Sequence, residues 1–515
     1  MTYRWKKADA EVRIEKRLKD VETVTIRDYK RDMSLENIQT NEGYRVKGAH
    51  LYADIINLDD MLHCTDTEGV SCHRRTLRFL NQHFRTVHQI LARVDAIKVD
   101  FHNQRLHAVV ARPYDTETGA EASRVHRAVA TAQLIIDVLK ETGSEDEHID
   151  AAKMRVGIDT GTALAVNNGR GGYREPLFLG KPANHAAKRA GGGRGLGIFL
   201  TNDARTEIGL NTVDNENTKA LTKAEIEVSQ KAAALEVTKD EMVQWWRDDM
   251  DTHPFSEFEF FRQTPPFRDM KIEDLTPANS RRQEAISLYG DIDGFTAYVD
   301  RHIGDDERAK DVVRTLHVLR AEMDAVLASD FGGKKIRFIG DCIHGLMAEG
   351  TAQTPDVEAT ISNAVLCAGG LRSSFELSLE KLANKEIDTD GLGIGIGLEY
   401  GVITVTRLGM RGARIRCAVS RSIVESEARQ KICEGDDTAI GQHAYDQGTA
   451  AIRTLFGKHR KKVGLDYDTV VQELVDGGDE TAKKARQAVH ATVYVPAAVK
   501  TMEHTVRPHC APIRS

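Results

Sequence analysis

Hydrophobic and polar positions follow the same order in two separate blocks of this chain. Each block has an apolar run, a stretch with apolar residues three and four positions apart, two short apolar runs meeting at a polar turn, a second long stretch and a Gly-punctuated apolar run. These patterns predict strand, helix, two strands, helix and strand. The predicted elements are 49–58, 75–94, 97–110, 122–142 and 154–166 in the first block, and 285–295, 309–329, 335–347, 361–382 and 392–405 in the second.

The residues themselves also repeat between the two blocks. Leu-Tyr-Ala-Asp-Ile at 51–55 matches Leu-Tyr-Gly-Asp-Ile at 288–292, and Val-Gly-Ile-Asp-Thr-Gly at 156–161 matches Ile-Gly-Leu-Glu-Tyr-Gly at 396–401. The offset between the copies grows only from 237 (288 − 51) to 240 (396 − 156). A repeat of this length indicates two copies of one domain. We therefore predict an α+β fold of two tandem ferredoxin-like βαββαβ domains, each with its helices on one face of an antiparallel sheet.

The remaining segments surround these two copies. We expect a helical lead-in at 1–45, a first domain at 46–202, a helical and loop connector at 203–280, a second domain at 281–433, and a C-terminal extension at 434–515 with helical segments and a strand candidate at 490–497.

Composition narrows the class of protein. The 515 residues are 41% hydrophobic and 29% charged, which is typical of globular domains. With a net charge of −7, the chain is not expected to have an extended basic surface that binds nucleic acid. Seven scattered cysteines suggest reduced thiols. The charged N-terminus is unlike a signal peptide, and no apolar run approaches the ~20 residues of a membrane span. We expect a cytoplasmic protein with no membrane or nucleic-acid partner.

Two aspartates in the second copy form a candidate metal site. Asp291 ends an apolar strand, and Asp341 follows Gly340 at the tip of a predicted hairpin. Two carboxylates at neighbouring strand ends suit Mg²⁺ or Mn²⁺, and the carbonyl of Ile292 is a further candidate ligand. Either Asp alone is more simply a solvated strand-end or turn residue. Their joint occurrence in Asp-Ile-x-Gly-Phe (291–295) and Ile-Gly-Asp (339–341) favours the metal site.

These motifs resemble those of the class III nucleotidyl cyclases, the family with the adenylate and guanylate cyclase fold. The resemblance extends over both copies. It implies that Asp291 and Asp341 hold two divalent ions. One ion would lower the pKa of the ribose 3′-hydroxyl and the other would neutralise the triphosphate, so that the 3′-oxygen attacks the α-phosphorus and diphosphate leaves.

The first copy contains a match to the other half of the family's site. Gly180-Lys-Pro-Ala-Asn184-His-Ala-Ala-Lys188 has the family spacing, and positions four apart share one helix face. The resemblance implies that Asn184 orients the ribose and that Lys188 stabilises charge on the α-phosphate. The family usually has Arg at this position, and Lys offers no planar fork, so Arg189 is a candidate substitute. The alternative is an ordinary polar helix start.

The two copies have lost complementary residues. Gln104 stands at the position of Asp341, and Asp54 survives alone in the first copy. Val424 and Ala428 stand at the positions of the Asn and Lys, or Glu425 and Arg429 after a slip of one residue. We therefore predict an intramolecular pseudo-dimer with one complete and one broken site.

The positions that select the base depart from the purine cyclases. Asp100 and Leu177 stand where purine-selective members usually have Lys and Asp. Tyr289 and Arg337, two and four residues before the metal-binding aspartates, resemble the bacterial pyrimidine cyclases of Pycsar anti-phage defence, which make cyclic UMP or cyclic CMP. The resemblance implies that Tyr289, Arg337 and Asp100 bind substrate. Aromatic packing is the alternative for Tyr289, and Arg337 lies on the half whose base-reading position should face the broken site.

The resulting hypothesis is an enzyme that converts UTP to 3′,5′-cyclic UMP and diphosphate, and whose product acts on a separate effector protein. The alternatives are a cytidylate cyclase, an adenylate or guanylate cyclase with atypical base contacts, and a regulatory cyclase-homology protein that binds nucleotide without turnover. Further association into homodimers stays open.

Overall fold

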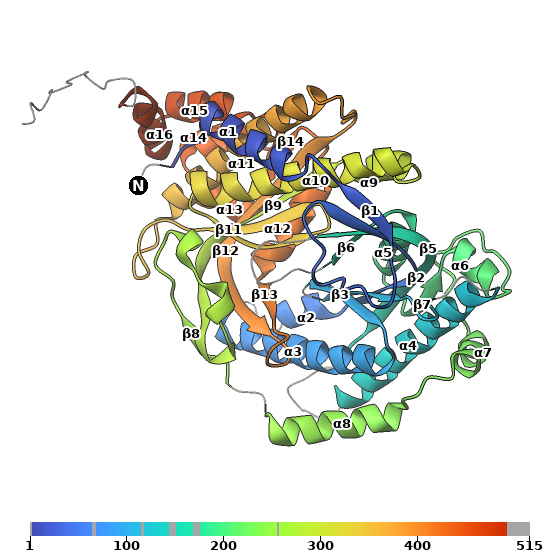
Figure 1. Ribbon diagram of the computed structural model, residues 1–515. Coiled ribbons are helices and arrows are strands. Elements are labelled where there is room, and N and C mark those ends of the chain that lie inside the picture. Colours follow the sequence, from blue (N-terminus) through green and yellow to red (C-terminus); the bar gives the residue numbers. More distant parts are fainter. Residues whose placement is uncertain are drawn as a thin grey trace, which may run out of the picture.

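Two sheets form the framework of the molecule, one from each half of the chain (Figure 1). The computed structural model describes residues 3–63, 68–102, 104–114, 118–143, 151–167, 176–254 and 257–491. The helices α10 and α11 cover one outer side and α3 and α4 the other, with the two sheets between them (Figure 1). Within the described residues, no helix combines the length and the apolar character that crossing a bilayer requires.

The first sheet has seven strands in the order β3-β4-β2-β5-β6, with β1 beside β2 and β7 beside β5. Its strands are β1 (Thr25–Asp28), β2 (Glu42–Ile55), β3 (Ile97–His102), β4 (Arg105–Val110), β5 (Met154–Asn167), β6 (Pro176–Leu179) and β7 (Gly197–Leu200). The helices of the first half are α1 (Lys7–Asp20), α2 (Leu58–Leu62), α3 (Val70–Arg93), α4 (Ala120–Thr142), α5 (Lys181–Ala190) and α6 (Asn202–Glu207). The connector adds α7 (Lys223–Ala233) and α8 (Lys239–Thr252).

The second sheet has eight strands in the order β10-β11-β9-β12-β14-β15, with β13 beside β12 and β8 beside β9. Its strands are β8 (Phe260–Phe261), β9 (Ser280–Asp293), β10 (Lys334–Ile339), β11 (Cys342–Met347), β12 (Gly393–Leu408), β13 (Ile415–Val419), β14 (Asp437–Ile440) and β15 (Lys461–Val463). The helices are α9 (Phe295–His302), α10 (Asp306–Ala325), α11 (Val357–Ala383), α12 (Arg421–Lys431), α13 (Gln442–Gln447), α14 (Ala450–Phe456), α15 (Tyr467–Asp476) and α16 (Glu480–Ala491).

The two halves confirm the predicted pair of α+β domains. The core of each sheet has the same strand order, β3-β4-β2-β5 and β10-β11-β9-β12. The pairing register repeats as well, since Tyr52 lies opposite Gly157 and Tyr289 lies opposite Gly397. Equivalent residues of the two domains therefore have equivalent neighbours. Where the two copies have different residues at one position, those residues can be compared directly, because they occupy the same place in each domain.

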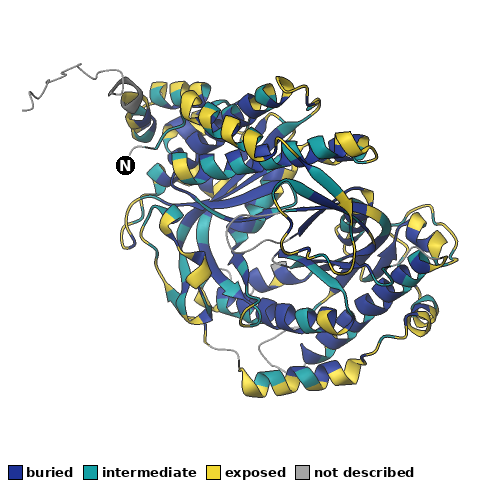
Figure 2. Cartoon of the chain, viewed as in Figure 1, coloured by how far each residue is buried: buried dark blue, intermediate teal, exposed yellow. Residues whose placement is uncertain are grey.

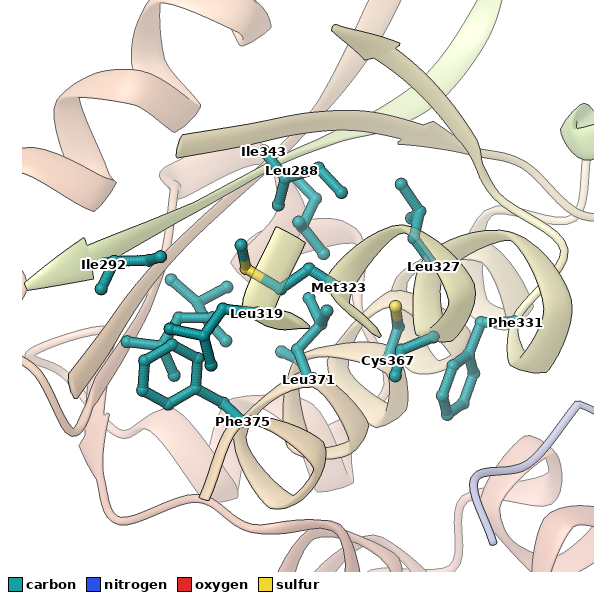
Figure 3. Packing of buried hydrophobic residues seen from close by; sticks show 14 of the residues in the cluster. Leu288, Ile292, Leu319, Met323, Leu327, Phe331, Ile343, Cys367, Leu371 and Phe375 are labelled. Atoms are coloured by element: carbon teal, nitrogen blue, oxygen red, sulfur yellow. The ribbon is translucent and has the colours of Figure 1, made fainter. Parts of the chain in front are cut away.

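Alternation along β9 separates the core face from the site face. Leu288 and Ile292 pack with Met323 and Leu371 beneath the helices (Figure 3). Successive strand residues point to opposite faces, so the odd-numbered residues of β9, including Asp291, leave the sheet on the side away from α10 and α11. The hydrophobic pattern that builds the core therefore also directs this carboxylate out of it.

Each domain extends a hairpin into the core of the other. The β5–β6 hairpin contributes apolar side chains to the second domain's cluster: Leu164, Val166, Leu177 and Leu179. The β12–β13 hairpin contributes apolar side chains to the first domain's cluster: Leu408, Ile415, Cys417 and Val419. Burying this shared apolar surface holds the domains in one orientation. Exposed residues are concentrated on outer helices such as α7 and α8 (Figure 2).

The ends of the chain differ from the expected organisation in two places. The lead-in 1–45 contains α1, but also β1 and the start of β2. β1 escaped prediction because its last two residues are exposed and charged, as is common on edge strands. The boundary at 433 cuts the second sheet, because β14 pairs with β12 as β7 pairs with β5. The strand candidate 490–497 lies outside the described residues, except that α16 ends at its first two residues.

Candidate active site

The structure brings the two predicted metal-binding aspartates together. Asp291 lies near the end of β9, and Asp341 lies in the turn between β10 and β11. The strands β9 and β11 are neighbours, with Gly290 opposite Ile343. Gly340 has φ of +63°, a conformation that favours glycine and tightens the turn. The backbone N–H of Ile292 donates a hydrogen bond to the carboxyl of Asp341.

The electrostatics of this pair suit a divalent cation. Burial, followed by the nearby charge of Asp291, raises the pKa of Asp341 well above its usual value. Burial raises the pKa of Asp291 to about 6, although the Gln430 side chain and the Cys342 thiol hydrogen-bond to it. A divalent cation held by these carboxyls would offset the cost of ionising both of them. The residues present therefore fit the metal that the fold implies.

The remaining ligands must come from elsewhere. The described part of the chain contains no group of three or more His, Cys, Asp or Glu side chains arranged to hold a metal. Mg²⁺ in nucleotide enzymes commonly uses one or two carboxylates together with water and substrate phosphates. The carbonyl of Ile292 stays a predicted ligand.

The helix α5 presents Asn184 and Lys188 away from the sheet. Its buried alanines face β5, where a Cβ on Gly157 would lie 2.1 Å from the carbonyl oxygen of Ala186, so this glycine permits close packing. Asn184 is half-buried and Lys188 is exposed. A Cβ on Gly180, which precedes the helix, would lie 3.2 Å from Ile303 of the second domain. The start of α5 therefore lies beside the C-terminal end of α9.

The equivalent helix of the second domain lacks both polar residues. A Cβ on Gly397 would approach the carbonyl oxygen of Ser426 and the backbone nitrogen of Gln430, as one on Gly157 would approach the same atoms of Ala186 and Ala190. The offset of 240 therefore holds through α12. Val424 and Ala428 stand at the equivalent positions, and the alternative alignment to Glu425 and Arg429 is wrong.

In the second potential site, internal side chains contact the surviving aspartate and the start of α12. Arg105 donates to Asp54 over 2.8 Å, and Arg105 stands at the position of Cys342. A guanidinium thus pairs with the surviving aspartate where the other copy would have its metal. At the start of α12, the carboxylate of Glu68 accepts from the backbone N–H of Arg421 over 2.8 Å. Sequence reasoning missed Arg105 and Glu68, although Arg105 adjoins the Gln104 that replaces the second aspartate.

The two predicted base-reading charges pair with each other. Arg337 on β10 and Asp100 on β3 form an ion pair of 2.7 Å across the domain interface. Arg337 also donates to the carbonyl of Phe101. The two residues are equivalent positions of the repeat (337 − 100 = 237), so their contact places them around the approximate two-fold axis that relates the domains. Their assignment to one of the two potential sites, and their binding of substrate, stay predictions.

The Tyr289 side chain is buried by packing, unlike a side chain that is exposed for substrate binding. It is 1% exposed, and its ring stacks on His344 with centroids 4.3 Å apart. Tyr52 stacks on His107 in the same way, with centroids 4.1 Å apart. Packing thus accounts for the ring in both copies. Among the described residues the Tyr289 hydroxyl has no hydrogen-bond partner, so a nucleotide contact stays a prediction for that atom.

Comparison with known proteins agrees with this geometry. A uridylate cyclase of Pseudomonas aeruginosa is 56% identical over 509 residues, covering 99% of this chain and 98% of the relative. A uridylate cyclase of a Rhizobium species is 39% identical over 445 residues, covering 83% of each. No family model matches the chain.

The chain belongs to the uridylate cyclase family.

A solved structure gives the fold of this family. The crystal structure of a class III adenylyl cyclase-like ATP-binding protein from Pseudomonas aeruginosa is 57% identical, with a TM-score of 0.90, and the match covers 92% of this chain and 100% of that one. The resemblance to class III cyclases is therefore confirmed. As a member of the uridylate cyclase family, the protein is a nucleotide cyclase.

We expect the Asp100–Arg337 pair to stabilise the domain interface of this uridylate cyclase family member. Replacing Arg337 with Leu should reduce the free energy of unfolding by about 3 kcal/mol, because the half-buried Asp100 carboxylate loses its ion-pair partner. The variant with both residues replaced by Leu should lose less than the sum of the single changes. Urea denaturation measures all three. Additive losses would contradict the pairing, and Lys223→Leu on exposed α7 is the matched control, with little expected change.

Proposed function

We propose that this chain converts UTP to 3′,5′-cyclic UMP and diphosphate at a single centre between its two domains. The observation that carries the proposal is the asymmetry of the two potential sites. One has the neighbouring carboxyls of Asp291 and Asp341, and the start of α5 lies beside the same domain. In the other, Arg105 pairs with Asp54, the equivalent of Asp291, and Glu68 accepts from the backbone N–H of Arg421 at the start of α12. The names of the curated relatives support UTP as the substrate.

The roles of the residues follow from their places. Asp291, Asp341 and the carbonyl of Ile292 would hold two Mg²⁺ or Mn²⁺ ions. Bound there, the ions would supply a lowered pKa at the ribose 3′-hydroxyl and neutralise the triphosphate. Asn184 would orient the ribose by hydrogen bonding, which holds the 3′-oxygen in line with the α-phosphorus. Lys188, one helical turn further on, would stabilise charge on the α-phosphate oxygens.

The shared cores support an intramolecular pseudo-dimer. Each domain contributes a hairpin to the other's hydrophobic cluster, so both half-sites are held in place within one chain. No second subunit is needed to complete the centre. We further propose that the cyclic nucleotide acts as a messenger on a separate effector protein, in line with the resemblance to cyclases of anti-phage defence.

A comparison of four nucleotides tests the proposed reaction. Purified chain is incubated separately with UTP, CTP, ATP and GTP in the presence of Mn²⁺ or Mg²⁺, and product and diphosphate are quantified. We expect cyclic UMP and diphosphate in equal amounts from UTP, and no product when EDTA removes the metal. Preferred turnover of CTP or a purine nucleotide would overturn the substrate. Binding without diphosphate release from any nucleotide would instead indicate a regulatory module.

A further inference from the structure

We infer that Arg320 on α10 is a specificity residue that donates a hydrogen bond to a ring carbonyl oxygen of uracil. Sequence motifs give no role to this residue. The inference rests on the proposed function, because it concerns how the same site selects its base.

Packing holds the Arg320 guanidinium in a defined place. The residue is 5% exposed, and its guanidinium carbon lies 4.0 Å from the centroid of the Phe338 ring. The amine of Lys335 lies 4.4 Å from the same ring and pairs with Asp324. A cation held against an aromatic ring loses little further conformational entropy on binding. Arg320 is therefore preorganised for a directional contact.

Arg320 lines a cavity of about 60 Å³ between the domains. The second domain contributes Arg320 and Phe338 to its wall, and the first domain contributes Val166 and Asn167. Val166 pairs across the β5–β6 hairpin with Leu177, the position that the family resemblance assigns to base selection. The cavity therefore lies beside the position on the β5–β6 hairpin that the family resemblance assigns to base selection.

The charges around Arg320 link this cavity to the proposed centre. Burial lowers the pKa of Arg320 to about 9, and the carboxylates that raise it again include Asp341 and Asp100. The guanidinium therefore lies near both a predicted metal ligand and the first domain's base-slot carboxylate. The equivalent residue of the first domain is His83 (320 − 83 = 237), whose pKa burial lowers to about 3. A guanidinium thus stands at this position only in the domain that has both predicted metal-binding aspartates.

The hydrogen-bonding edge of uracil is complementary to the Arg320 guanidinium and the Asp100 carboxylate. It presents carbonyl oxygens on both sides of the N3–H group. A guanidinium only donates, and a carboxylate only accepts. Arg320 can meet a carbonyl while Asp100 accepts from N3–H, since a carboxylate paired with Arg337 retains further lone pairs. Cytosine has an amine in place of the 4-oxygen and no proton at N3, so it offers no such match.

Thio-substituted substrates test the contact directly. The kcat/KM of cyclisation is measured for UTP, 2-thio-UTP, 4-thio-UTP and CTP with wild-type protein and with Arg320→Gln and Arg320→Lys. For UTP we expect a loss of about 10- to 100-fold in Arg320→Gln, the range for a hydrogen bond to a charged group, with partial rescue in Arg320→Lys. One thio substitution should lower kcat/KM in wild type and have no further effect in Arg320→Gln. Discrimination of UTP from CTP should fall at least tenfold in that variant.

Controls separate this inference from the proposed function and from unfolding. Arg314→Gln makes the same change on the same helix, at a residue paired with Asp311 and outside the cavity wall, and it should keep wild-type selectivity. The inference would be overturned if the thio substitutions lowered kcat/KM equally in wild type and in Arg320→Gln. It would also be overturned if kcat/KM for UTP fell less than threefold in a folded Arg320→Gln variant. Failure of wild-type protein to cyclise UTP would refute the proposed function itself.

Discussion

Replacing Asp341 with Asn is expected to lower kcat for UTP cyclisation by at least about 10³-fold. Loss of a carboxylate ligand removes several kcal/mol of metal-based stabilisation of the transition state, and each 1.36 kcal/mol corresponds to a factor of ten. Asp291→Asn should have an effect of the same order. Diphosphate release under saturating Mn²⁺ and UTP measures both.

The fold should survive these changes. The pKa of Asp341 is raised in the folded protein, so its ionised form is disfavoured there, and it costs stability at a pH above the ordinary value of an aspartate. A neutral Asn avoids this cost. We therefore expect the metal-free variant to melt at the same temperature as wild type or higher. Lost activity with an intact melting transition then reports on the site.

Asp54→Asn is the matched control for the metal site. Asp54 occupies the position equivalent to Asp291, but it pairs with Arg105. We expect the variant to retain most of the cyclase activity. A folded but inactive Asp54→Asn protein would contradict the single-centre proposal, because it would show that both potential sites are needed.

The second large effect is expected on α5. Replacing Asn184 or Lys188 with Ala should lower kcat about 10²- to 10³-fold, the range for removing one preorganised group that stabilises transition-state charge. Lys188 is exposed and Asn184 is half-buried, so neither change should destabilise the fold strongly. Single-turnover rates with bound UTP measure the chemical step apart from substrate binding.

Equivalent positions on α12 supply the controls for α5. Val424→Ala changes the residue that corresponds to Asn184, and Lys223→Ala removes a lysine that is 92% exposed on α7. Both should retain wild-type turnover. An equal loss in Val424→Ala and Asn184→Ala would mean that the two helices serve the chemistry alike, which the proposed asymmetry forbids.

Much of the fold could be predicted from the sequence, because the periodicity of apolar residues and the repeat between the two copies can both be read directly from the chain. The spacing of apolar residues predicted twelve elements and their order. The offset between the copies indicated which residues are equivalent, apart from a slip of one residue at α12 that the packing of Gly397 resolved. The motifs around Asp291, Asp341, Asn184 and Lys188 were visible because each is contiguous. The short strands β1 and β14 were missed, since four residues give too little alternation to stand out.

Contacts between distant residues were decided only by the tertiary structure. The residues of the Asp100–Arg337 pair are 237 positions apart, and nothing in either local sequence requires them to meet. Arg105 resembles any strand-end arginine until it lies against Asp54. Arg320 belongs to an ordinary helix pattern, and only packing on Phe338 directs it into the interdomain cavity. The sequence by itself therefore determined the two domains and their relationship as copies, and it predicted the residues of the two half-sites. Which charges pair depended on how the domains pack, because burial and distance set those interactions.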